Sequence, residues 1–143
     1  MLKNVSAKRL YEMIQGPEEL ASTDIREEGD FGLAHILLCA NIPLSHLEIR
    51  IPDLVPRKAT PVVICDEDGI DAKIAAQRLK FFGYTDVGVL EGGVKEWAEA
   101  GFEIFSGLNV PSKAFGEFIE HAYGTPSVSA EELKTMMDNK DDI

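Results

Sequence analysis

The run Pro61-Val62-Val63-Ile64-Cys65 is uncharged and mostly β-branched, which is typical of a strand buried on both faces. Short apolar runs alternate along the chain with stretches whose apolar residues recur every three or four positions, the spacing of a helix. Strands that alternate with helices in this way usually pair in parallel, because each crossover contains a helix. The sequence therefore predicts an α/β fold, with a central parallel sheet flanked by helices on both faces.

The individual elements follow from the same pattern and from the residues that end them. Glycine and proline interrupt helices, so Gly16-Pro17 and Gly83 each mark the end of one. Strands are expected at 4–6, 20–25, 35–38, 61–65 and 86–90. Helices are expected around 10–14, 44–54, 72–82 and 94–100 and within 108–124, with a short helical turn after residue 27.

The composition is that of a soluble globular chain, with 45% apolar and 27% charged residues. The net charge of −11 repels nucleic-acid phosphates and anionic membranes, so neither is an expected partner. Two cysteines, Cys39 and Cys65, suit a reducing compartment. No apolar run approaches the roughly 20 residues of a membrane helix, and no signal-peptide core is present, so we expect a cytoplasmic protein.

A stretch near the C-terminus repeats one near the N-terminus, since residues 128–137 match residues 5–14 at a constant offset of 123. One explanation is two unrelated capped helices, because Ser129 and Glu132 form a capping-box pattern. The other is a second copy of the same domain. The second explanation predicts a domain at 1–107, a helical linker at 108–125 and the strand and helix of a truncated copy at 126–143. Exchange of that last segment between chains would give a homodimer.

Several motifs stand in an order that resembles a rhodanese domain over residues 1 to about 105. They are Asp24-Ile25-Arg26-Glu27, Phe31-x-x-x-His35-Ile36, Asn41-Ile42-Pro43-Leu44, Gly83-Tyr84-Thr85-Asp86-Val87 and Leu90-Glu91-Gly92-Gly93-Val94-x-x-Trp97. The resemblance implies a rhodanese-like parallel sheet flanked by helices, and sulfurtransferase chemistry. The tail resembles the junction between tandem repeats of bacterial multi-rhodanese proteins. Further rhodanese-like repeats of the same polypeptide are therefore the expected partners.

The active loop is where this chain departs from the family. In a rhodanese the loop follows the central strand and reads Cys, Arg, small, Gly, x, Arg, and its cysteine carries sulfur as a persulfide. Aligned on the glycine, this chain reads Asp66, Glu67, Asp68, Gly69, Ile70, Asp71. Asp66 occupies the nucleophile position, and carboxylates replace both arginines. The comparison predicts a catalytically degenerate module with a structural or partner-binding role, without a cofactor or metal.

Cys65 is the alternative nucleophile, in an active thiosulfate-type sulfurtransferase that forms a persulfide on this residue. A free thiol is roughly 3% thiolate at pH 7, and burial and neighbouring carboxylates lower that fraction. A side chain one position earlier on a strand points to the opposite face. Cys65 would reach the pocket only in a seven-residue loop, as in rhodanese-like phosphatases, whose final arginine is here Asp71. We expect Cys65 against the sheet and Asp66 among the loop N–H groups.

The acidic loop also fits two other patterns. Asp66-Glu67-Asp68-Gly69 after an apolar strand is similar to the nucleophile motif of haloacid-dehalogenase-type phosphatases, which bind Mg²⁺. Those enzymes need a later acidic pair, and the pair Asp141-Asp142 has no strand before it. The loop carboxylates would also bind a cation adventitiously. The side chains expected beside the loop are Asp24, Arg26 and His35, the first two as a pair and the third bonded to backbone groups.

Overall fold

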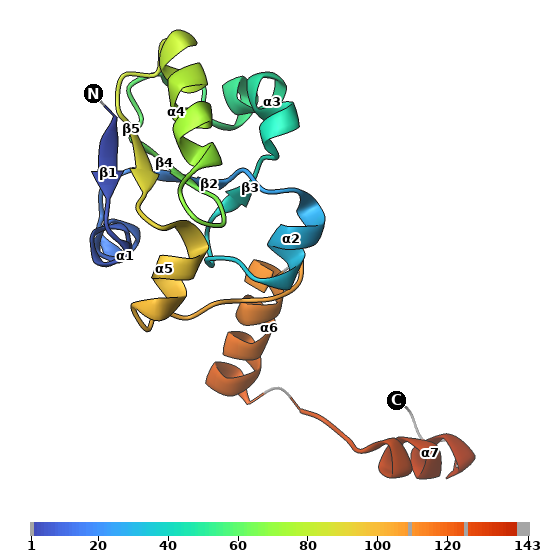
Figure 1. The fold of residues 1–143 in the computed structure, drawn as a ribbon. Coiled ribbons are helices and arrows are strands. Elements are labelled where there is room, and N and C mark those ends of the chain that lie inside the picture. Colours follow the sequence, from blue (N-terminus) through green and yellow to red (C-terminus); the bar gives the residue numbers. More distant parts are fainter. Residues whose placement is uncertain (1, 109, 125, 140–143) are drawn as a thin grey trace. The chain divides into compact units, whose positions relative to one another are not determined.

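A computed structural model describes residues 2–108, 110–124 and 126–139. The chain divides into two compact units, Met1–Val110 and Pro111–Ile143. The first unit contains a five-stranded parallel sheet with strand order β1-β5-β4-β2-β3, which confirms the predicted α/β fold (Figure 1). The strands are β1 (Lys3–Val5), β2 (Ala21–Asp24), β3 (Ala40–Asn41), β4 (Val62–Cys65) and β5 (Val87–Leu90).

Helices cover both faces of this sheet, and the sheet separates two apolar cores (Figure 1). On one face, α3 and α4 contribute Leu47 and Leu79 to the first core. On the other, α1, α2 and α5 contribute Leu10, Phe31 and Trp97 to the second. The helices of this unit are α1 (Ala7–Gln15), α2 (Glu28–Leu33), α3 (Leu47–Leu54), α4 (Asp71–Phe81) and α5 (Gly93–Glu99), with a 3-10 turn η1 (Leu44–His46) before α3.

Strand β4 lies inside the sheet and contributes to both cores. Val62 and Ile64 belong to the first core, whereas Val63 and Cys65 belong to the second. The alternation follows from the pleat of a strand, in which successive side chains point to opposite faces. The apolar run 61–65 is therefore uninterrupted by polar residues, because both faces of β4 are covered.

The strand predicted at 35–38 is wrong. His35 makes only an isolated bridge with Phe105, and the strand that pairs with β2 is the later β3. Leu38 has φ +71, which ends the extended backbone before β3 begins. Ile36 and Cys39 are nevertheless buried in the second core. An apolar run that packs as a loop carries the same hydrophobic signal as a short strand.

The second unit contains α6 (Val110–Tyr123) from its second residue on, and α7 (Ala130–Asn139). Ser129 begins α7 with the predicted capping box, because its Oγ accepts from the Glu132 N–H at 3.2 Å and its own N–H donates to Glu132 Oε2 at 2.7 Å. These hydrogen bonds hold the pKa of Glu132 below its ordinary value. Ser6 caps α1 at the matching position.

The strand expected at the start of a second copy is absent from residues 126–129, which have no regular structure. A parallel strand needs a hydrogen-bonded neighbour, and in the first unit β5 supplies it to β1. The remainder of the expected copy, residues 140–143 with the pair Asp141-Asp142, lies outside the described residues. Among the helices that are described, none has the length and apolar character needed to traverse a bilayer.

Candidate functional site

The loop that joins β4 to α4 folds around the carboxylate of Asp66. The N–H of Gly69 donates to Asp66 Oδ1 at 2.5 Å, and the N–H of Ala72 donates to Oδ2 at 2.9 Å. Asp66 is only 3% exposed. Ala72 lies in the first turn of α4, so the carboxylate occupies a helix N-terminus, where the backbone dipoles favour an anion. This is the arrangement expected for Asp66 at the nucleophile position.

The glycine pair Gly92-Gly93 allows the start of α5 to pack closely against the backbone of the loop between β4 and α4. Gly93 has φ +62, and a Cβ there would lie 2.5 Å from the carbonyl carbon of Glu67 and 2.6 Å from the oxygen of Asp66. The N–H groups of Val94 and Lys95 donate to the carbonyl oxygens of Asp66 and Glu67 at 2.9 and 3.2 Å. The Gly-Gly-Val element therefore supports the loop backbone.

Arg26 lies beside the loop, with a side chain that is 9% exposed. Its Nη2 donates to Asp24 Oδ2 and to the Ala34 carbonyl, both at 2.6 Å, and its Nη1 donates to Glu67 Oε2 at 3.0 Å. Burial lowers the pKa of Arg26, but the hydrogen bonds and charges of Asp24 and Glu67 outweigh burial and raise it above its ordinary value. The expected Asp24–Arg26 pair is confirmed, and the guanidinium is already bound to protein acceptors.

Cys65 is fully buried in the second core and does not line the loop pocket. Its Sγ is 3.9 Å from the Sγ of Cys39. The pKa of Cys65 is raised well above its ordinary value by the contact with Cys39, by burial and by the charges of Asp24 and Asp66. The thiol is therefore protonated at neutral pH. The expected burial of Cys65 against the sheet is confirmed.

His35 was expected beside the loop, but it does not line the loop pocket. The residue is 2% exposed, and its ring stacks on Phe31 with 4.0 Å between ring centroids. Its Nδ1 lies 2.9 Å from the Phe31 carbonyl oxygen and donates to it in the tautomer protonated there. The backbone of His35 also pairs with Phe105. The stacking and hydrogen bonds tie the ring to α2, where it supports the fold.

A pocket of about 780 Å³ opens beside the loop. The carboxylates that line it are Glu27, Asp30, Asp66, Glu67, Asp68 and Asp71, and Arg26 is the lining cation. The pocket field therefore opposes an anionic ligand. Glu27 and Asp30 were not among the site residues predicted from the sequence. Their acidic side chains around the start of α2 can be read from the sequence, but their position near the loop cannot. Within the described ranges, no three His, Cys, Asp or Glu residues are placed to hold a metal ion.

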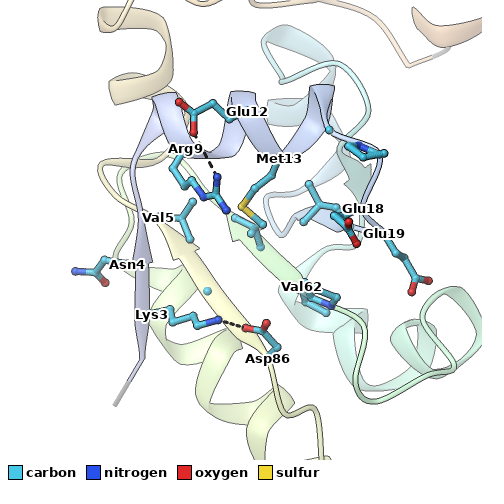
Figure 2. Close-up of a pocket in the computed structure, with 16 residues that line it drawn as sticks. Lys3, Asn4, Val5, Arg9, Glu12, Met13, Glu18, Glu19, Val62 and Asp86 are labelled. Atoms are coloured by element: carbon cyan, nitrogen blue, oxygen red, sulfur yellow. Dashed lines mark hydrogen bonds and ion pairs between the residues drawn. The ribbon is translucent and has the colours of Figure 1, made fainter.

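A second cavity, of about 770 Å³, lies between α1 and the amino ends of the strands (Figure 2). Its charged side chains include two ion pairs, Arg9–Glu12 at 3.3 Å and Lys3–Asp86 at 2.6 Å. Figure 2 shows both pairs within this cavity, the first on α1 and the second beside the sheet. Neither cysteine and no residue of the 66–71 loop lines it. The loop residues that the sequence singled out line the other pocket instead, and they are Asp66, Glu67, Asp68, Ile70 and Asp71.

Comparison with known proteins gives a consistent result. The family model described as "Rhodanese-like domain" matches residues 6–100. The structure of a thiosulfate sulfurtransferase from Pseudomonas aeruginosa is 43% identical with a TM-score of 0.88, over 98% of this chain and 27% of that chain. A structure described as "rhodanese with anions from E. coli" is 28% identical with a TM-score of 0.55, over 62% of this chain and 99% of that chain.

Among curated proteins, the uncharacterized protein YqhL of Bacillus subtilis is 38% identical over 74 residues. The match covers 52% of this chain and 57% of that relative, so the chain spans little more than half of the relative's length.

Proposed function

The chain belongs to the rhodanese-like domain family, and on that basis we propose that it is a catalytically degenerate rhodanese module with a structural or partner-binding role. The observation that carries the proposal is the carboxylate of Asp66, which accepts the loop N–H groups at the start of α4. A persulfide forms when a thiolate attacks a sulfur donor, and a carboxylate oxygen does not replace sulfur in that step. The loop's anion position is filled by a group that carries no transferable sulfur.

The charge around the loop supports the same conclusion. A sulfurtransferase of the thiosulfate type must admit an anionic donor, whereas six carboxylates and one arginine line this pocket. Two unit charges 4 Å apart repel by about 1 kcal/mol even in bulk water, and by more where water is partly excluded. Arg26 does not offset this repulsion for a ligand, because Asp24 and Glu67 already bind its guanidinium.

The alternative is an active sulfurtransferase that forms a persulfide on Cys65. The 43% identity to a thiosulfate sulfurtransferase favours it. Against it, Cys65 would have to leave the second core and ionise despite its raised pKa. The two functions therefore differ in a measurable species, a persulfide on Cys65.

We expect no thiosulfate:cyanide sulfurtransferase turnover above the buffer reaction, because the thiolate that would accept sulfur is missing from the loop. The test combines a thiocyanate assay with intact-protein mass spectrometry after thiosulfate treatment. Cys65→Ser serves as the control for any added mass, since it removes the alternative nucleophile. A gain of one sulfur atom that disappears in Cys65→Ser would establish the alternative and overturn the proposal.

We also propose that the module works beside further rhodanese-like repeats of the same polypeptide. The similarity to the Pseudomonas aeruginosa enzyme runs over 98% of this chain, including the tail, but occupies only 27% of that longer chain. The internal repetition between 5–14 and 128–137 supports this proposal, as do the matching serine caps of α1 and α7. On this view α7 is the first helix of the next repeat.

The exposed apolar side chains of α7 predict self-association of the isolated chain. Leu133 is 37% exposed and Met137 is 62% exposed, and exposed apolar stripes tend to find partners. We expect hydrogen-exchange protection of amides 130–138 to rise with protein concentration, as in a homodimer through residues 126–143. Leu133→Ser combined with Met137→Ser should abolish the rise, since neither residue belongs to the cap. Unprotected exchange at every concentration would contradict the association.

A further inference from the structure

We propose that the loop pocket binds a basic peptide segment of a partner protein, one that carries an aliphatic residue among its lysines or arginines. The inference rests on the proposed function, since it assigns a ligand class to a pocket that no longer admits a sulfur donor. It depends on two features of the pocket walls: carboxylates that no cation of the described chain neutralises, and apolar side chains exposed beside them.

The negative charge available to a ligand comes from four carboxylates. Asp66 is bound to backbone N–H groups, and Glu67 pairs with Arg26 at 3.0 Å and with Lys95 at 3.4 Å. Within the described residues, the ion pairs do not reach the other acidic side chains of the lining. Those side chains are exposed, and they are Glu27, Asp30, Asp68 and Asp71.

Apolar side chains form the remaining wall of the pocket. Leu33 at the end of α2 is 77% exposed, and Ile70 at the end of the loop is 63% exposed. Leu44 also lines the pocket, where it is half-buried and packs against the first core. A ligand that carries only positive charge would leave this apolar surface in water. A peptide with an aliphatic residue among its cations would cover both kinds of wall.

The spread of the carboxylates favours an extended ligand over a single ion. Glu27 and Asp30 lie at the start of α2 and within it, Asp68 lies on the loop, and Asp71 begins α4. No group of three metal-ligating side chains converges among the described residues, so these carboxylates do not form a metal site. Basic side chains spaced along an extended peptide would each pair with a different one of these carboxylates. Charge complementarity of this kind mainly sets which partner is chosen and how fast it associates.

The test is a fluorescence-anisotropy titration of the full chain with a labelled peptide of four lysine or arginine residues around one leucine. The pocket variant combines Asp30→Asn, Asp68→Asn and Asp71→Asn, which keep size and hydrogen-bonding capacity. The matched control neutralises three exposed carboxylates elsewhere, with Asp53→Asn, Glu99→Gln and Glu103→Gln. We expect the pocket variant to bind about tenfold more weakly and the control to change less than about twofold.

Two peptide controls test the two walls separately. Replacing the central leucine by serine should weaken binding, and replacing the cations by glutamate should abolish it. Equal weakening in both triple variants would overturn the proposal, because net charge alone would then explain the binding. Spermine that competes as well as the peptide, with no effect of the leucine, would also overturn it. Absence of peptide binding in a chain without turnover contradicts this inference alone, whereas turnover by the unmodified chain contradicts the proposed function.

Discussion

The variant Asp66→Cys, Glu67→Arg, Asp71→Arg is expected to turn over thiosulfate, whereas the unmodified chain is not. In this variant a thiol replaces the carboxylate that accepts the N–H groups of Gly69 and Ala72. The start of α4 and the two arginines lower the pKa of that thiol, because each favours the thiolate. They also reverse the charge that an anionic donor meets. Thiocyanate production at saturating thiosulfate and cyanide measures the gain.

The matched control carries the same two arginines but Asp66→Ser, so it offers the same cations to an anionic donor and lacks the sulfur nucleophile. The control should remain inactive. A thermal melt of both variants shows whether the fold tolerates the arginines, since Glu67→Arg removes the pairs with Arg26 and Lys95. A folded cysteine variant that forms no persulfide by mass spectrometry would contradict the assignment of residue 66 to the nucleophile position.

Gly93→Ala is expected to destabilise the fold strongly. Its Cβ would meet loop backbone at 2.5 and 2.6 Å, in a residue with φ +62. The left-handed backbone costs about 1–2 kcal/mol for a residue with a Cβ, and overpacking costs about 1–3 kcal/mol more. The expected loss is therefore about 2–5 kcal/mol, out of the 5–15 kcal/mol that is typical of a domain.

Gly101→Ala separates the two contributions, because Gly101 has φ +84 but no atom within 4 Å of an added Cβ. We expect this control to lose only about 1–2 kcal/mol, the cost of the backbone conformation. Urea unfolding of both variants measures the difference. Equal losses in the two variants would mean that the approach of α5 to the loop contributes nothing to stability.

Local sequence patterns were sufficient for the central strand and for the position of the loop carboxylate. The uncharged run 61–65 predicted a strand covered on both faces, and β4 has that position. Alternation along a strand predicted that Cys65 would face away from the loop pocket, and Cys65 is buried in the second core and does not line that pocket. Ser129 and Glu132 predicted the cap of α7. Each of these features depends on residues within a few positions of one another, so the chain encodes them locally.

Contacts between distant segments were beyond the same reasoning. The run 35–38 has the composition of a strand, but the edge strand that pairs with β2 is Ala40–Asn41. The positive φ of Leu38 interrupts the extended conformation before that strand. Val128 and Ser129 match Val5 and Ser6 at the end of β1, but residues 126–129 form no strand, and the described part of the second unit offers no neighbour like β5. A strand exists only where another strand offers hydrogen bonds, and that partner is chosen by the whole fold.

The sequence by itself determined the α/β architecture, the carboxylate at position 66 and the buried thiol at position 65. Only the tertiary structure brought Glu27 and Asp30 beside the loop, bound the Arg26 guanidinium to Asp24 and Glu67, and formed one acidic pocket with apolar walls. The physical reason is the distance along the chain over which each effect acts. Residue type and strand alternation act over a few positions, whereas the field of a pocket sums charges that the crossovers of a parallel sheet bring together from separate parts of the chain.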